Sequence, residues 1–86
     1  MKTILRVSSF RYLGGHRLYL EFNNGEAGVV DLSSELDGPI FQPLRDPDVF
    51  ATVSLDGGTI AWPNGADLAP EYLAERLVEQ GVARNA

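Results

Sequence analysis

Residues 16–22 alternate between polar and apolar side chains, and an Asn-Gly pair follows them at Asn24-Gly25. Such alternation is typical of a half-buried strand. An Asn-Gly pair between two strand-like runs is the strongest short-range signal for a β-hairpin. With a two-residue turn at Asn24-Gly25, the apolar face of the hairpin consists of Leu18, Leu20, Phe22, Ala27 and Val29. Tyr19 and Val30 are then expected to pair on the opposite face.

The remaining elements follow from the same kind of pattern. Residues 4–13 predict a first strand, which ends at Gly14-Gly15, and residues 53–56 and 59–62 predict a second hairpin around Gly57-Gly58. Asp46-Pro47 predicts the start of a short helix, with Asp46 as the N-cap.

Residues 70–80 form the one convincing helix of the sequence, because Leu73 and Leu77, and also Ala74 and Val78, recur four residues apart. The predicted fold class is therefore α+β: an antiparallel meander sheet of about five strands, with two hairpins and the C-terminal helix packed on one face.

The size and composition limit what such a fold can contain. The chain has 86 residues, which predicts one domain over residues 1–86. It has no cysteine, so disulfides and thiolate metal sites are excluded. No run of about 18 apolar residues is present, so we expect no membrane contact. Arg6 and Arg11 interrupt the start, which lacks the pattern of a secretory signal, and a cytoplasmic location is expected.

Charge is distributed unevenly along the chain. Residues 1–17 contain Lys2, Arg6, Arg11 and Arg17 and no acid, whereas residues 18–86 contain all twelve acids. The basic first strand could pair with acidic neighbours inside the fold, support self-association, or contact nucleic acid. Because nucleic-acid binders usually carry a basic total or a dense basic face, and the formal net charge here is −5, a nucleic-acid partner is not the favoured interpretation.

No residue pattern predicts catalysis. His16 is the only histidine and is interpreted as a solvated turn residue, since no spacing places a nucleophile and an orienting acid beside it. Asp46, Asp48, Asp56 and Asp67 do not have the spacing of a calcium-binding loop, and each is interpreted as a cap or turn residue. We therefore predict a protein that is not an enzyme, with no catalytic, cofactor-binding or metal-binding residues.

Two features could contribute to an interaction surface. Glu71, Glu75 and Glu79 recur every four residues and form an acidic stripe on the predicted helix, which is either a solvated face or a surface for a basic partner. Trp62 is either a lid on the core with its N–H bonded to a carbonyl or an exposed anchor for a partner. The candidate interaction surface consists of Trp62, Glu71, Glu75 and Glu79.

Several motifs extend over most of the chain. The turn Phe22-Asn23-Asn24-Gly25 is followed by Asp31-Leu32, then by a stretch with Gly38, Phe41, Leu44, Asp46 and Phe50, and finally by W-P-N-G-x-D-x-x-P-E, beginning at Trp62. In this combination the sequence resembles domain of unknown function family 2442. The resemblance implies an α+β meander fold and a partner encoded by a neighbouring gene, in an arrangement similar to toxin–antitoxin pairs. Some members carry a helix-turn-helix domain, which is expected to be absent here because the sequence ends at Ala86.

The resulting hypothesis is a non-catalytic protein-interaction module without a cofactor, which forms a homodimer or pairs with another small protein. The alternative hypothesis is a weak nucleic-acid-associated accessory domain that uses the basic first strand, with Phe10 and Tyr12 as stacking surfaces.

Overall fold

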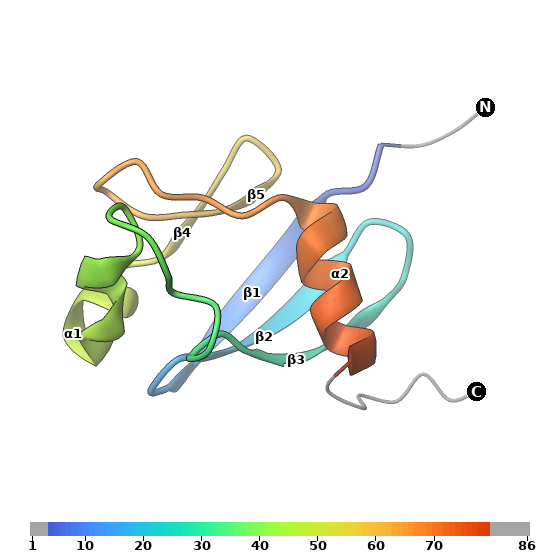
Figure 1. Cartoon of the computed structure of the whole chain (residues 1–86). Helices are drawn as coiled ribbons and strands as arrows, with labels where there is room; N and C mark the ends of the chain where they lie inside the picture. The colour runs from blue at the N-terminus through green and yellow to red at the C-terminus, as the bar shows by residue number, and fades with distance from the viewer. Residues whose placement is uncertain (1–3, 80–86) are drawn as a thin grey trace.

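The computed structural model describes residues 4–79, with the side chains of Val78 and Glu79 excepted. Its elements, in chain order, are β1 (Val7–Gly14), β2 (Arg17–Phe22), β3 (Ala27–Asp31), a 3-10 helix (Gln42–Arg45), α1 (Pro47–Phe50), β4 (Ser54–Asp56), β5 (Thr59–Ala61) and α2 (Pro70–Glu79). Figure 1 shows these elements along the chain. The α+β class, the two hairpins and the C-terminal helix predicted from the sequence are confirmed.

The five strands divide into two antiparallel sheets. β1, β2 and β3 form a three-stranded meander, and β4 and β5 form a separate two-stranded sheet. The two sheets meet at the start of β1, where the Val7 N–H donates to the Gly58 carbonyl at 2.8 Å. Gly57 and Gly58 both have positive φ, the conformation that a two-residue hairpin turn of the primed type requires and that glycine adopts without strain.

The register of the β2–β3 hairpin differs from the predicted one by one residue. The Phe22 N–H donates to the Glu26 carbonyl at 2.8 Å, so three residues, Asn23–Gly25, form the loop. Gly25 has a φ of 93°, as expected at the last position of a three-residue hairpin loop. Because strand side chains alternate between faces, this one-residue shift moves every side chain of β3 to the other face.

The expected core positions of β3 were therefore wrong. Val30 is fully buried and Gly28 is buried, whereas Ala27 is exposed and Val29 is half-buried. Leu20 lies opposite Gly28, and Tyr19 opposite Val29. The predicted core positions on β2, Leu18, Leu20 and Phe22, are confirmed.

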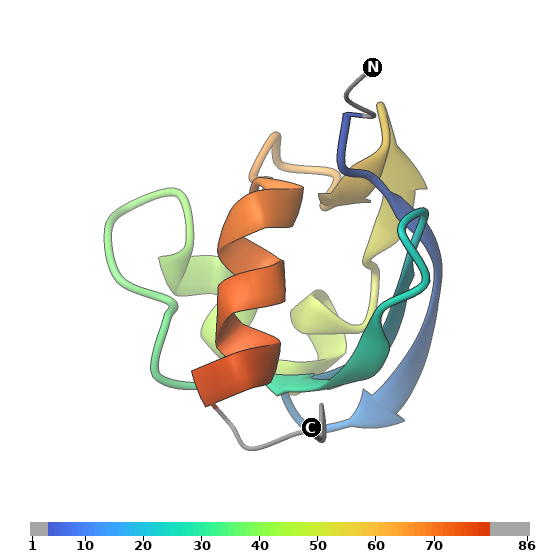
Figure 2. The same cartoon turned by 90° about the vertical axis from the view of Figure 1, so that its right-hand side faces the viewer.

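Helix α2 covers one face of the three-stranded sheet. Figure 2 shows it packed on the concave side, with no described helix on the convex side. Leu73 is fully buried and Leu77 nearly so, as the four-residue spacing predicts. The buried apolar residues of the described part form one cluster: Val7, Leu18, Leu20, Phe22, Val30, Leu32, Leu36, Leu44, Phe50, Val53, Ile60, Trp62, Ala66, Leu73 and Leu77.

The segment between β3 and β4 completes this core. Asp46 caps α1, because its side chain accepts a hydrogen bond from the Asp48 N–H, and Pro47 occupies the first helical position, as predicted. The short helix places Phe50 in the centre of the cluster, fully buried. No helix in the described part of the chain has the length and apolar character needed to span a bilayer.

The observed register can be tested with a matched pair of substitutions. Val30→Asp places a carboxylate in the core and is expected to unfold the domain, because an unpaired buried charge costs several kcal/mol. Val29→Asp places the same carboxylate on the outer face and is expected to change the free energy of unfolding by about 1 kcal/mol or less. Urea titration followed by circular dichroism distinguishes them. If Val29→Asp were the more damaging substitution, the two-residue turn would be correct.

Candidate interaction surfaces

Trp62 belongs to the core. Its side chain is 4% exposed, and its indole N–H donates to the Phe50 carbonyl at 2.9 Å. Its ring lies 5.4 Å from that of Phe50. The interpretation of Trp62 as a lid on the core is confirmed, and the indole offers no exposed anchor to a partner.

The residues after Trp62 join β5 to α2. The Trp62 N–H donates to the Ala66 carbonyl, which closes a turn over Pro63–Gly65. Asn64 extends this turn to the middle segment, because its side-chain amide donates to the Ile40 carbonyl at 2.9 Å. The segment is a structural junction that fixes the start of α2 relative to the sheet.

A shallow apolar hollow of about 330 Å³ lies beside this junction, and its lining includes Pro43, Val49, Thr52 and Pro63. Trp62 forms part of its floor. Its lining is mostly apolar, with Asp48, Thr52 and Asn64 among the lining residues, so it could accept an apolar side chain.

The sequence suggested that His16 is a solvated turn residue, but the structure shows that its side chain connects two segments of the fold. Its Nε2 atom lies 3.0 Å from the Leu44 carbonyl and 2.9 Å from the Arg45 carbonyl. Since both neighbours are acceptors, Nε2 carries a proton. The ring also packs edge-on against Phe50, at 5.0 Å between centroids. His16 thus attaches the 3-10 helix to the start of β2, a contact that no local sequence signal indicates.

The four loop aspartates do not form a metal site. Among the described residues, no group of three or more His, Asp and Glu side chains is arranged to hold a metal ion. Asp46 is a helix cap, and Asp67 forms a short bridge to Ala61 at the end of β5.

The acidic residues of α2 lie on its solvent side. Glu71 and Glu75 are exposed, and within residues 4–77 neither forms an ion pair. The side chain of Glu79 lies outside the described residues. The predicted acidic stripe is therefore present at its first two positions.

Next to these acidic residues, α2 carries a polar cluster that the sequence did not indicate. The Tyr72 hydroxyl donates to Glu35, and Arg76 donates to the same carboxylate at 3.1 Å. The Tyr72 hydrogen bond, followed by the positive charge of Arg76, lowers the pKa of the Glu35 carboxyl below its usual value. The cluster fastens the turn after β3 to the helix. Tyr72 and Arg76 follow Glu35 by 37 and 41 residues in the sequence, so only the tertiary fold brings Glu35 to the helix.

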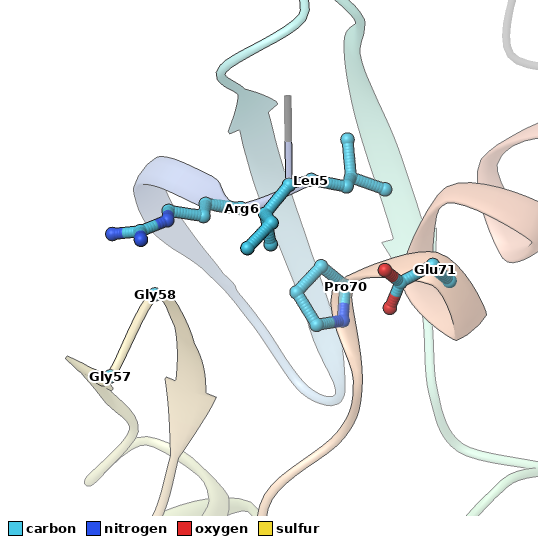
Figure 3. A pocket seen from close by; sticks show the side chains of 7 residues that line it. Leu5, Arg6, Gly57, Gly58, Pro70 and Glu71 are labelled. Carbon is cyan, nitrogen blue, oxygen red and sulfur yellow. The ribbon is translucent and has the colours of Figure 1, made fainter. Parts of the chain in front are cut away.

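A hollow of about 510 Å³ lies between the segment before β1, the β4–β5 turn and the start of α2. Figure 3 shows Arg6 and Glu71 on its two sides, with Arg6 extending over Gly58. A side chain at position 58 would be crowded, because a Cβ atom there would lie 3.3 Å from the Arg6 side chain. The hollow combines one cation and one anion with apolar walls.

The convex face of the three-stranded sheet is the outer face, defined by Arg11, Leu13, Tyr19, Glu21 and Val29. These residues line a shallow hollow of about 400 Å³. Leu13 is 38% exposed, and Tyr19 and Val29 are half-buried. The Tyr19 hydroxyl donates to Glu21 at 3.1 Å, and this hydrogen bond raises the pKa of the Tyr19 hydroxyl.

Comparison with known proteins gives a family match and a shared fold. The model of the family described as "Protein of unknown function (DUF2442)" matches residues 7–79. No curated protein matches the chain. The fold is shared with the crystal structure of a protein from Nitrosomonas europaea ATCC 19718, described as a putative DNA-binding protein. The TM-score is 0.73 at 24% identity, and the match covers 88% of this chain and 50% of that chain. This chain therefore spans half the length of that protein.

The Glu35 cluster leads to a prediction about stability and pH. Because the pKa of Glu35 is lowered in the folded state, its carboxylate stabilises the fold fully above its ordinary pKa of 4.5, and this contribution is lost as the pH falls through the lowered value. Glu35→Gln is therefore expected to lower the free energy of unfolding by about 1–2 kcal/mol at pH 7. Below about pH 4 the difference from the wild type should shrink. Urea titrations at several pH values measure it.

Asp37→Asn provides the control, because its partner Arg45 and Asp37 itself are 57% and 86% exposed. An exposed ion pair contributes about 0–1 kcal/mol, so this variant should remain near the wild type. A Glu35→Gln variant as stable as the wild type at pH 7 would contradict the role assigned to the cluster.

Proposed function

The chain belongs to the DUF2442 family, and we propose that it is a non-catalytic protein-interaction module. Its partner is either a second copy or another small protein. The function of the family is unknown, so the proposal is based on the surface of the molecule.

The observation that carries the proposal is the outer face of the three-stranded sheet, which no other element of residues 4–79 covers. Leu13, Tyr19 and Val29 contribute apolar surface to it, and Arg11, which lies opposite Tyr19 in the sheet, and Glu21 contribute charged groups. Aromatic residues and arginine are enriched in protein interfaces. The exposed Glu71 and Glu75 of α2 belong to the proposed interaction surface, whereas Trp62 does not, because it is buried.

Substitutions on the outer face test this proposal. In the double variant Leu13→Ser/Val29→Thr, the loss of apolar contact area is expected to weaken association at least about tenfold. Light scattering measures self-association, and affinity capture followed by mass spectrometry and titration with the purified partner measures pairing with another protein.

Leu55→Ser is the matched control, because Leu55 is 41% exposed and lies on β4 in the second sheet. It should leave association unchanged. A strictly monomeric chain that captures no partner would count against the proposal, as would equal effects of the two sets of substitutions.

A second candidate function is association with nucleic acid through β1, and it is favoured by the description of the Nitrosomonas europaea protein. Arg11 lies on β1, Arg6 precedes it and Arg17 begins β2, and all three side chains are exposed. The expected stacking surfaces are not available, because Phe10 and Tyr12 pack against the core, and the Tyr12 hydroxyl donates to the Gly15 carbonyl. Any contact would therefore be electrostatic, without base stacking.

Titration of single-stranded DNA and RNA oligonucleotides at low salt tests this candidate. An electrostatic contact should be lost in the double variant Arg6→Glu/Arg11→Glu, because phosphate binding depends on the number of neutralising cations. Arg45→Glu changes an arginine of the 3-10 helix and should retain more of the binding than the double variant does. Absence of any binding by the wild type at low salt would exclude the candidate.

A further inference from the structure

The two edges of the three-stranded sheet differ. β1, at one edge, is contacted by β4 and β5, and its Val7 N–H is bonded to Gly58. β3, at the other edge, pairs only with β2 among the described strands. Both views of the fold show β3 at the margin of the sheet, with no described strand beyond it (Figures 1 and 2). We call the side of β3 that faces away from β2 the open edge.

The hydrogen bonds of the hairpin fix which backbone groups face the open edge. The backbone N–H of Phe22 donates to the Glu26 carbonyl, and the backbone N–H of Leu32 donates to the His16 carbonyl. Since hydrogen-bonded pairs alternate along an antiparallel ladder, Gly28 and Val30 also direct their backbone groups towards β2. Ala27 and Val29 therefore direct their N–H and C=O groups to the open edge. Within residues 4–79, no group accepts a hydrogen bond from either N–H.

The open edge lacks three features that protect many edge strands, whereas two others are present, because β3 has only five residues and α2 packs on it. Such strands commonly carry lysine, proline or a bulge, which discourage pairing with another chain. The sequence of β3 is A-G-V-V-D, without lysine or proline, and its pairing with β2 is regular over all five residues. Its backbone groups are therefore suited to accept an additional strand.

The charges around β3 indicate the chemistry of that strand. Of the five acids in residues 18–44, Glu35 and Asp37 form ion pairs with Arg76 and Arg45, so the charge at the open edge comes from the acids that flank β3 and from α2. Glu26 precedes β3, Asp31 ends it, and α2, which packs on β3, presents the exposed Glu71 and Glu75. Arg17 lies opposite Asp31 but belongs to β2, one strand away from the edge. Because complementary charge steers association and suppresses wrong partners, the surroundings of the open edge favour a basic segment.

We propose that the open edge of β3 binds an extended, basic segment of another protein, which pairs with Ala27 and Val29 and adds a fourth strand to the sheet. This mode of binding takes its affinity from backbone hydrogen bonds and its specificity from alternate side chains. A second copy of the chain is disfavoured, because two copies with a formal net charge of −5 each repel one another. The inference rests on the proposed function and specifies the kind of partner.

The probe is an acetylated, amidated peptide of seven residues in which arginine and valine alternate. Two peptides of the same length serve as controls: one with glutamate in place of arginine, and one with arginine retained but N-methylated at every residue, which removes the backbone hydrogen-bond donors from both edges. In titrations of the ¹⁵N-labelled full chain, the arginine peptide should shift the Ala27 and Val29 amide signals most. The N-methylated and the glutamate peptides should bind at least about tenfold more weakly, because one lacks the donors and the other the complementary charge.

Variants of the chain test the same contact from the other side. Val29→Pro removes one donor from the open edge and no hydrogen bond within the fold, and it should weaken binding of the arginine peptide at least about tenfold. Glu26→Lys should weaken it by about three- to tenfold at low salt, and less at high salt. Asp56→Lys makes the same charge change at the exposed β4–β5 turn and should bind as the wild type does. If Val29→Pro fails to fold, Glu26→Lys and the N-methylated peptide still decide the question.

Three results would overturn the inference: equal binding of the arginine and glutamate peptides, equal binding of the N-methylated peptide, or a dimer in which the Ala27 and Val29 amides become protected, which would make a second copy the occupant. The proposed function is judged separately. If Leu13→Ser/Val29→Thr abolishes association while Glu26→Lys and Val29→Pro do not, the interaction module stands and the docking of a strand at β3 is wrong.

Discussion

A sheet of three strands with one helix long enough to cover it leaves half of its surface to solvent. The ten residues of α2 cover the concave face, and the short helices of the middle segment close the rest of the core. Chains of this size bury a smaller fraction of their surface than larger domains do. The partial exposure of Leu13, Tyr19 and Val29 follows directly, because residues 4–79 place no second layer over the convex face.

The core is closed by contacts between backbone and aromatic side chains. Phe50 contributes its ring to the centre of the cluster, and its carbonyl accepts the indole N–H of Trp62. His16 attaches the preceding 3-10 helix to β2. Buried polar groups are stable when they are hydrogen-bonded, and these bonds let an irregular, proline-containing segment lie across the core. The same contacts explain why the only tryptophan is structural.

Much of the candidate surface could be anticipated from local patterns, and the remainder could not. The four-residue spacing on α2 predicted both the buried Leu73 and the exposed Glu71 and Glu75. The Asn-Gly pair predicted the hairpin but not its loop length, since two- and three-residue loops are both compatible with it. This difference of one residue in loop length decides which face of the sheet Val29 and Val30 occupy, and hence the composition of the outer face.

The sequence by itself determined the class of fold, the two hairpins, the capped helix α1 and the amphipathic helix α2, because each depends on residues close together in the chain. The tertiary structure decided the register of β3, the separation into two sheets, the role of His16 and the Glu35–Tyr72–Arg76 cluster. These features join residues that are distant in sequence, and neither periodicity nor turn chemistry encodes such a pairing. The open edge of β3 also depends on the tertiary structure, since a strand is an edge strand only by virtue of how the other strands pair.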